Sequence, residues 1–248
     1  MPKSCILIFF PLALDQVGNQ AAKTRFMFGG KAKIPMVIRT TVEGGKGYAG
    51  QHSQSLEAIV TQFPRLKVVA PSNACDANGL LKSSIRDDDP VIYIEQQLLY
   101  TEKDSVPEDD YLVPIGSAQV VREGRDLTAV AYSLMVKRLL AAADLAAAAG
   151  ISIEIIDIRT LVPLDEKTLC VSVRKTGRLP CVCQTPRTGC FPEHIAYRIQ
   201  NRCFSDLRSP VKIVAAHDVP PPMAFTLENE NMPSVKKIYD AMKTLMGN

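Results

Sequence analysis

The residues best placed to do chemistry lie in one stretch, 34–57, and His52 is central to it. The apolar run Met36-Val37-Ile38 predicts a buried strand. A glycine-rich loop follows, and His52 then opens a segment with the apolar spacing of a helix. Ligands of open α/β sheets bind outside the carboxyl ends of the strands, where an imidazole can exchange a proton near neutral pH. From this pattern alone, a helix-capping or structural histidine is the more ordinary interpretation, and a catalytic histidine is the alternative.

A second candidate is a cluster with the residue types of a zinc site, made of Cys181, Cys183, Cys190 and His194. The alternation in L-P-C-V-C places Leu179, Cys181 and Cys183 on one face of a strand, and free cysteine is a common small core residue. We therefore interpret the cluster as core. The seven cysteines have irregular spacing, which does not suggest a disulfide framework and favours a reducing compartment.

Alternating strands and helices must position these residues. In the first hundred residues, the pattern predicts helices over 12–27 and 73–85 and strands over 36–39, 66–70 and 91–94. The segment with helical spacing that His52 opens lies between the first two strands. Strands and helices that alternate in this way indicate a parallel sheet with right-handed crossovers.

Residues 101–111 are acidic and have no hydrophobic period, so we expect them to link two domains. The pattern then restarts, with strands predicted over 127–132, 151–156, 179–183 and 211–215 and helices over 135–149, 164–173, 193–200 and 234–246. The sequence therefore predicts an α/β protein with a first domain over 1–100 and a second over 112–248.

Composition excludes several classes of protein. Apolar residues make up 46% of the chain and charged residues 22%, which is typical of globular proteins. The formal net charge of +3, without a basic run, does not indicate a nucleic-acid partner. No apolar segment is long enough to span a bilayer, and the short apolar run after Lys3 lacks the cleavage site of a signal peptide. We expect no nucleic-acid or membrane partner and see no targeting segment.

Several motifs resemble one known family. They are D-Q-V-G-N-Q-A-A-K, I-R-T-T-V-E-G-G-K-G-Y-A-G-Q-H-S-Q-S-L-E, G-L-L-K-S-S-I-R-D-D-D-P-V-I-Y-I-E, I-E-I-I-D-I-R-T-L-V-P-L-D and H-D-V-P-P-P. From about Phe9 onward, in order and spacing, the chain resembles the β subunit of the thiamine-diphosphate-dependent 2-oxo acid dehydrogenases. That group includes the pyruvate, branched-chain and acetoin enzymes.

The resemblance implies a fold and a cofactor. The expected fold is a transketolase-like pyrimidine-binding domain, shortened at its N-terminus, followed by a transketolase C-terminal-type α/β domain. Thiamine diphosphate is the implied cofactor, with an α subunit supplying the magnesium site. The resemblance assigns His52 to the active site, facing the substrate and the incoming lipoyl group. It aligns Phe9 with an aromatic residue that lies against the pyrimidine.

The resemblance also implies a potassium ion held by backbone carbonyls. The aligned residues are Met36, Ser84, Ile85, Asp87 and Asp89. Hard cations take oxygen ligands, and the turn after a helix presents free carbonyls. We expect the acidic run 87–89 to add favourable charge. The alternative from the sequence alone is a solvated turn at the end of a helix.

The implied activity is oxidative decarboxylation of pyruvate, or a related reaction of another 2-oxo acid or acetoin, with acyl transfer to lipoamide. The implied partners are the α subunit, a second β subunit and a lipoyl-bearing acyltransferase core. Such enzymes work in the bacterial cytoplasm, the mitochondrial matrix or plastids.

Three departures from the family bear on activity. The family's chain starts at least two strand–helix units earlier, and that part carries the glutamate that hydrogen-bonds the aminopyrimidine. In addition, Gln184 replaces an acidic residue and Cys190 replaces a glycine. We therefore expect the 248-residue chain alone to be inactive. The alternative function is a non-catalytic fragment or interaction subunit that lacks the cofactor-activating glutamate.

Overall fold

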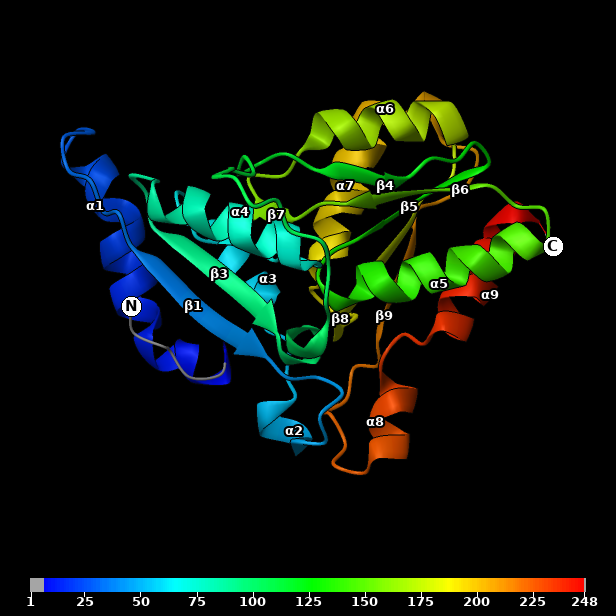
Figure 1. Cartoon of the computed structure of the whole chain (residues 1–248), viewed down its shortest axis with the longest axis horizontal. Helices are drawn as coiled ribbons and strands as arrows, with labels where there is room; N and C mark the ends of the chain where they lie inside the picture. Colours follow the sequence, from blue (N-terminus) through cyan, green and yellow to red (C-terminus); the bar gives the residue numbers. More distant parts are fainter. Residues whose placement is uncertain (1–6, 248) are drawn as a thin grey trace.

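The fold consists of two sheets that lie side by side, with helices packed around each of them (Figure 1). A computed structural model of the chain describes residues 7–247, without the side chains of residues 7–9. Within that range, every helix is too short or too polar to cross a bilayer.

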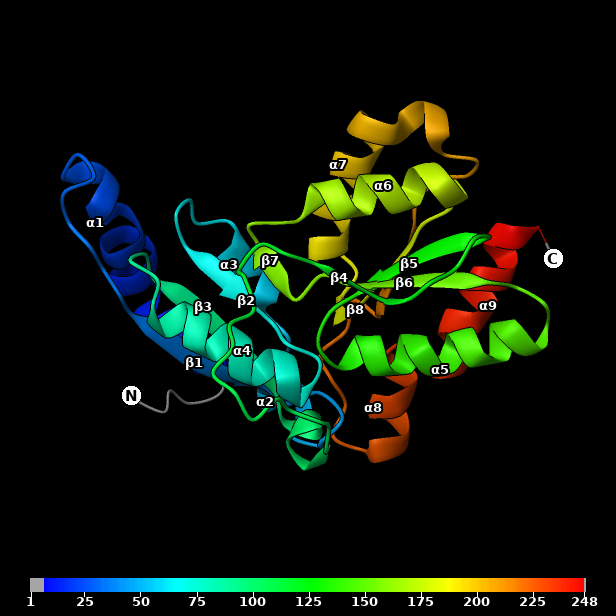
Figure 2. The ribbon, with the colours of Figure 1, turned by 45° about the horizontal axis from the view of Figure 1, so that its top comes forward.

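The first sheet has the strand order β1-β3-β2-β7. Strands β1 (Val37–Val42), β3 (Val91–Gln96) and β2 (Lys67–Val69) are parallel, as the pattern of alternating elements predicts. Helix α4 (Ala74–Ile85) lies along β3 (Figures 1 and 2). It begins where predicted, because the Asn73 side chain accepts a hydrogen bond of 2.8 Å from the Asp76 amide and so satisfies one of the free amides at the helix start.

The second sheet has the order β4-β6-β5-β8-β9. Its strands are β4 (Gln119–Arg122), β6 (Ile153–Asp157), β5 (Leu127–Ala131), β8 (Pro180–Pro186) and β9 (Lys212–Ala216), and only β4 is antiparallel to its neighbour. Side chains alternate across each strand, so one face of the sheet packs against α5 (Leu134–Ala148) and α9 (Val235–Met246). The other face packs against α6 (Glu166–Thr176) and α7 (Phe191–Cys203) (Figure 1).

Several elements differ from the predicted pattern. The predicted helix over 12–27 is divided into the 3₁₀ helix η1 (Leu7–Ala13), the π-helix η2 (Asp15–Ala21) and α1 (Ala22–Met27). His52 closes the short helix α2 (Ala49–His52), and a separate helix α3 (Glu57–Thr61) begins after a break. The prediction that His52 opens a helix was therefore wrong. The break has a physical cause, because the Ser55 side chain is hydrogen-bonded to Gln184 of the second domain.

Four further elements carried no strong sequence signal. They are β4, β7 (Thr160–Val162), α8 (Phe225–Asn231) and the 3₁₀ helix η3 (Gln97–Thr101). A short 3₁₀ helix, η4 (Phe204–Asp206), follows α7. Residues 102–118 contain neither helix nor strand, and this segment is longer than the predicted linker. The exact domain boundaries stay a prediction.

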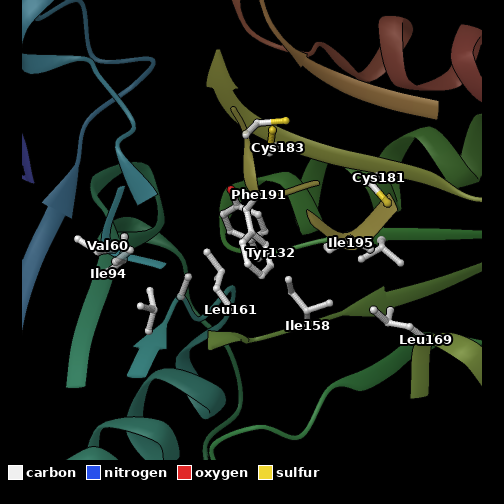
Figure 3. Packing of buried hydrophobic residues seen from close by; sticks show 14 of the residues in the cluster. Val60, Ile94, Tyr132, Ile158, Leu161, Leu169, Cys181, Cys183, Phe191 and Ile195 are labelled. Atoms are coloured by element: carbon white, nitrogen blue, oxygen red, sulfur yellow. The ribbon is translucent and has the colours of Figure 1, made fainter. Parts of the chain in front are cut away.

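Strand β7 connects the two domains. It comes from the second half of the chain, yet it pairs antiparallel with β2 at the edge of the first sheet. The two sheets also share one hydrophobic core. Figure 3 shows Val60 and Ile94 of the first domain facing Leu161 and Tyr132 of the second, and all four belong to one buried cluster.

A buried polar network joins the domains beside this core. The Arg159 guanidinium lies 2.9 Å from the Asp76 carboxylate, and the two side chains are only 10% and 4% exposed. The Arg159 amide donates to Asp157, and the Ser72 hydroxyl donates to the other oxygen of Asp157. Burial raises the pKa of Asp157 to about 7. Each domain therefore supplies partners that the buried groups of the other domain require.

We predict that Arg159→Ala lowers the free energy of unfolding by about 3–5 kcal/mol, because it leaves the buried Asp76 carboxylate without its partner. Urea denaturation of the purified chain measures this change. Arg122→Ala is the matched control. It removes an exposed ion pair with Asp144 and should cost less than about 1 kcal/mol. Equal costs for the two variants would contradict the assigned role of Arg159.

Candidate active site

His52 lines a pocket of about 470 Å³. The pocket lies where β1 and β3 end, since Glu43 directly follows β1 and Gln97 directly follows β3. The other lining residues are Gly47, Tyr48, Ala49 and Met223. The predicted candidate histidine therefore faces an open pocket at the carboxyl ends of parallel strands, which is where open α/β sheets bind ligands.

Glu43 brings a carboxylate to the same pocket, and the sequence analysis missed it. Its side chain is nearly buried and accepts hydrogen bonds from the Thr41 hydroxyl at 3.2 Å and from the Gln97 amide. The sequence carried a partial signal, because Glu43 comes four residues after the predicted strand 36–39 and Gln97 three residues after the predicted strand 91–94. The pocket thus combines an imidazole, a carboxylate and a side-chain amide, which are groups that can bind polar ligands and move protons.

The glycine-rich loop needs glycine for steric reasons at Gly45. This residue has a φ of +93°, and a Cβ there would lie 2.7 Å from Leu98 Cδ1. The loop then folds back on itself, and the Tyr48 amide donates to the Ser53 hydroxyl at 3.1 Å. A positive φ disfavours other residue types, so the turn that presents His52 depends on Gly45.

A side chain of the second domain is hydrogen-bonded to the same loop. Glu228 on α8 is 1% exposed and accepts a hydrogen bond of 2.7 Å from the Gly47 amide. Figures 1 and 2 both show α8 beside α2, the helix that His52 closes. A carboxylate that accepts a backbone amide in a buried setting makes a strong, charge-assisted hydrogen bond. Glu228 is therefore a positioning residue for the His52 loop.

A chain of side-chain amides makes a second contact between the domains. Gln96 donates to the Gly44 carbonyl at 3.1 Å and to Gln184 at 3.2 Å, and Gln184 donates to the Ser55 hydroxyl at 2.6 Å. Gln184 and Ser55 line a separate pocket of about 390 Å³ between the domains. The neutral amide of Gln184 therefore uses both of its groups, because its oxygen accepts from Gln96 and its NH₂ donates to Ser55.

Glu57, in the S-L-E part of the motif, faces the core. Its side chain is 1% exposed, and burial raises its pKa to about 7, although a backbone hydrogen bond lowers it. Burial and the nearby Glu57 also raise the pKa of Tyr132. Glu57 does not line the His52 pocket, so we assign it no contact with a ligand there.

Phe9 belongs to η1, but its side chain lies outside what the structure describes. Its predicted contact with a pyrimidine therefore stays a prediction.

The residues predicted to hold potassium lie on neighbouring segments, and whether their carbonyls form an ion site stays a prediction. Ser84 and Ile85 end α4, Asp87 and Asp89 follow in the turn, and Met36 precedes β1. The Val91 amide donates to the Met36 carbonyl at 2.9 Å, so Met36 lies beside the strand that follows this turn.

The acidic run 87–89, which we expect to add favourable charge, is paired with basic side chains. Asp89 is paired with Arg25 at 3.0 Å and Arg65 at 3.2 Å, and Asp87 is paired with Lys67 at 2.6 Å. Burial opposes ionisation of Asp89, but these basic groups outweigh it and lower the pKa of Asp89. Any cation at this turn would therefore be held by carbonyl oxygens rather than by uncompensated carboxylates.

The cysteine cluster does not form a metal centre. Cys181, Cys183 and Cys190 are buried in the core, and the His194 ring packs against Phe191 with ring centroids 5.5 Å apart and the rings tilted. Among residues 7–247, no group of three or more histidine, cysteine or acidic side chains is arranged to hold a metal ion.

Comparison with known proteins identifies both domains. The transketolase pyrimidine-binding domain matches residues 6–103, and the transketolase C-terminal domain matches residues 116–238. A split-gene transketolase described as an inactive beta4 tetramer has the same fold, with a TM-score of 0.81 at 20% identity over 98% of this chain and 75% of that one.

Three relatives show higher sequence identity. The chain is 43% identical to the acetoin:2,6-dichlorophenolindophenol oxidoreductase subunit beta of Cupriavidus necator, over 96% of this chain and 70% of the relative. It is 43% identical to the mitochondrial pyruvate dehydrogenase E1 component subunit beta of Drosophila melanogaster, over 95% of this chain and 66% of the relative. It is 39% identical to the 2-oxoisovalerate dehydrogenase subunit beta of Bacillus subtilis, over 96% of this chain and 73% of the relative.

We predict that Glu228→Ala loosens the loop that carries His52. Hydrogen exchange at the Gly47 amide should become faster by about tenfold or more, because loss of this charge-assisted bond removes roughly 1.5–3 kcal/mol of local stabilisation. Glu230→Ala is the control, since Glu230 lies on the same helix but is exposed and pairs with Lys237. Unchanged exchange at Gly47 in Glu228→Ala would show that other contacts hold the loop.

Proposed function

The chain belongs to the family of β subunits of the pyruvate, acetoin and branched-chain 2-oxo acid dehydrogenases, and on that premise we propose that it is such a β subunit. Its component would act on pyruvate, another 2-oxo acid or acetoin and transfer an acyl group to lipoamide. The observation that carries the proposal is the pocket in which His52 and Glu43 meet at the carboxyl ends of β1 and β3.

The residues of this pocket fit a cofactor shared with a partner subunit. The pocket is lined by the polar groups of Glu43, His52 and Gln97, and all its lining residues except Met223 lie within the domain that matches the pyrimidine-binding model. Thiamine diphosphate, when bound, supplies the carbon nucleophile and the electron sink for cleavage beside a carbonyl. Phe9 would lie against its pyrimidine ring, and an α subunit would hold its diphosphate and magnesium.

His52 and Glu43 have separate roles in this proposal. The His52 imidazole faces the pocket and can hold or release a proton for the substrate or the lipoyl group. Glu43 is held in place by Gln97 and Thr41, so its carboxylate offers a fixed acceptor in the lining of the pocket. Glu228 and Gly45 keep the loop between Glu43 and His52 in position.

Uncovered apolar side chains support an assembly with other subunits. Leu12, Phe26, Met27 and Phe28 are between 65% and 88% exposed, and all lie on or near η1 and α1. Phe26, Met27 and Phe28 are consecutive at the end of α1, and a group of exposed large apolar residues marks a site of protein contact. We propose that this surface is covered in a heterotetramer of two α and two β subunits, which would work with a lipoyl-bearing acyltransferase core.

A potassium ion is the other proposed ligand. The carbonyls of Met36, Ser84, Ile85, Asp87 and Asp89 would hold it at the turn after α4. The end of a helix leaves carbonyls with hydrogen-bonding capacity for such a ligand. Met36 and Ser84 each already accept one backbone hydrogen bond, so they would offer the ion their second lone pair.

We predict that His52→Ala lowers the rate of acyl transfer to lipoamide by about a hundred- to ten-thousand-fold, because it removes general acid–base assistance. The assay combines the β chain with an α subunit, thiamine diphosphate and lipoamide, and it records carbon dioxide release in parallel. His217→Ala is the matched control, because His217 is exposed and lies outside the pocket.

The assay uses two forms of the protein, the 248-residue chain and a chimera that carries the N-terminal segment of the Cupriavidus relative. We expect turnover in the chimera and little in the chain alone. Equal loss in His52→Ala and His217→Ala would contradict the role of His52. Assembly and cofactor binding without turnover in either form would support the alternative of an interaction subunit.

We predict that potassium raises the thermal midpoint of the purified chain, because an ion that binds only the folded state stabilises it by mass action. The comparison is with tetramethylammonium at equal ionic strength. Met36→Leu and Ser84→Ala should keep the effect, since both residues would bind through the backbone. Equal midpoints in the two salts would remove the potassium site from the proposal.

A further inference from the structure

A basic pocket lies in the second domain, away from the candidate active site. It has a volume of about 420 Å³ and is lined by residues 208–212, which lead into β9, by residues 244–247 at the end of α9, and by Arg178. It shares no lining residue with the His52 pocket. Figures 1 and 2 both show the C-terminal end of α9 far from α2, the helix that His52 closes.

The charge of this lining has one sign. Arg178, Arg208 and Lys212 bring three positive groups, and none of the described residues that line the pocket is acidic. Among residues 7–247, these three side chains also make no ion pair, whereas Arg174 on α6 is paired with Asp206. Positive groups that lie together without counter-charges create a potential that attracts anions.

Arg178 keeps part of its guanidinium available for a ligand. Its Nε donates to the Leu245 carbonyl at 2.9 Å, so one nitrogen complements the carbonyl end of α9. The two terminal nitrogens have no hydrogen-bond partner in the part of the chain that the structure describes, and a guanidinium can bind two phosphate oxygens with such a pair. Support of the helix end therefore accounts for one nitrogen of Arg178, and it does not account for Arg208 or Lys212.

The fold holds the other two basic residues in place through their backbone. The Arg208 amide donates to the Gly177 carbonyl at 2.7 Å, and Gly177 ends α6 with a φ of +74°. A Cβ on Gly177 would lie 2.7 Å from Arg208 Cγ, so the missing side chain leaves room for the Arg208 stem to cross this turn. The Lys212 amide donates to the Leu179 carbonyl at 2.9 Å, which fixes the start of β9 beside β8. Donors that are held in place before a ligand arrives lose less entropy when it binds.

A hydroxyl in the same lining has no partner. The Ser209 Oγ is buried, and no residue in the range 7–247 is hydrogen-bonded to it. Buried hydroxyl groups are nearly always hydrogen-bonded, so Ser209 indicates a group that enters the pocket, independently of the three charges. A carboxylate has two oxygens in one plane, whereas the oxygens of a phosphoryl group spread tetrahedrally toward donors from several directions. The mixture of donors at residues 178 and 208–212 therefore favours a phosphoryl group.

We propose that this pocket is a binding site for a phosphoryl group, carried by a small phosphate monoester or present as inorganic phosphate. The Arg178, Arg208 and Lys212 side chains offset its negative charge, and the Ser209 hydroxyl donates to one of its oxygens. A water molecule occupies about 30 Å³ of liquid, so a pocket of about 420 Å³ has room for an organic group beside the phosphoryl group. The site is separate from the proposed enzymatic role and does not depend on it.

Isothermal titration calorimetry on the whole chain tests the site. The probes are inorganic phosphate and phenyl phosphate, at physiological ionic strength and without thiamine diphosphate. We expect saturable binding, and Arg208→Gln should weaken it by about tenfold or more, because a charge-assisted hydrogen bond is lost. The probe that binds more tightly identifies the source of the phosphoryl group, a monoester in the case of phenyl phosphate and the free ion in the case of inorganic phosphate.

Arg187→Gln is the matched control. Arg187 is exposed, lies outside the pocket and, like Arg178, donates to a backbone carbonyl, that of Ile213 at 3.0 Å. Its loss should change the affinity by less than about twofold, because salt screens charges outside the site.

Chemical protection locates the bound probe on the unmodified sequence. Lysines are acetylated with an N-hydroxysuccinimide ester and read by mass spectrometry. Bound phosphate should slow acetylation of Lys212 and leave Lys236, which is exposed on α9 and paired with Asp240, unchanged. The proposal is overturned if neither probe binds saturably to the folded chain, if Arg187→Gln and Arg208→Gln weaken binding equally while circular dichroism shows both folded, or if bound phosphate leaves Lys212 as reactive as before.

Discussion

The buried ion pair between Arg159 and Asp76 is the contact on which the arrangement of the two domains depends. A buried pair of this kind contributes little net stability, because desolvation of two charges offsets most of their attraction. Its effect is to raise the free energy of every domain arrangement in which the pair is broken, because a buried charge is then left without a partner. Arg159 also stands next to β7, which completes the first sheet, and its backbone donates to Asp157. One short segment therefore fixes both the charge pairing and the strand register between the domains.

The geometry of the candidate active site depends on the same arrangement of the two domains. His52 and Glu43 belong to the first domain, but the loop between them is held by Glu228 of the second. Gln184 of β8 also holds Ser55, just beyond that loop. A small rotation between the domains would break these hydrogen bonds together and release the loop. The shared core around Tyr132 and Leu161 resists that rotation because its side chains pack from both sheets (Figure 3).

The sequence predicted the elements that carry strong local signals. Strands with β-branched runs, such as Val91-Ile92-Tyr93-Ile94, and helices with a capping residue, such as Asn73 before α4, lie where their patterns indicated. Strand β7 was missed because a three-residue strand has too few positions to show alternation, and its partner β2 is far away in sequence. The end of the helix at His52 also depends on a residue that is distant in sequence, since Gln184 donates a hydrogen bond to the Ser55 side chain just after it.

The site was predicted only in part, for a similar reason. His52 stands out because the glycine-rich loop marks a turn after a strand. Glu43 follows the same strand but sits in a common V-E-G sequence, and its significance comes from Gln97, which the fold brings beside it. The acidic run 87–89 was expected from the sequence to add favourable charge. Its partners Arg25, Arg65 and Lys67 lie on other segments that only the folded chain brings together.

The central claim is that the Arg159–Asp76 pair couples the two domains, and a double-mutant cycle tests it most directly. The free energy of unfolding is measured for the parent chain, Arg159→Ala, Asp76→Ala and the double variant. We expect a coupling energy above about 1.5 kcal/mol, with the double variant far less destabilised than the sum of the single variants, because each single change leaves one buried charge unpaired. Additive effects within about 0.5 kcal/mol would contradict the account.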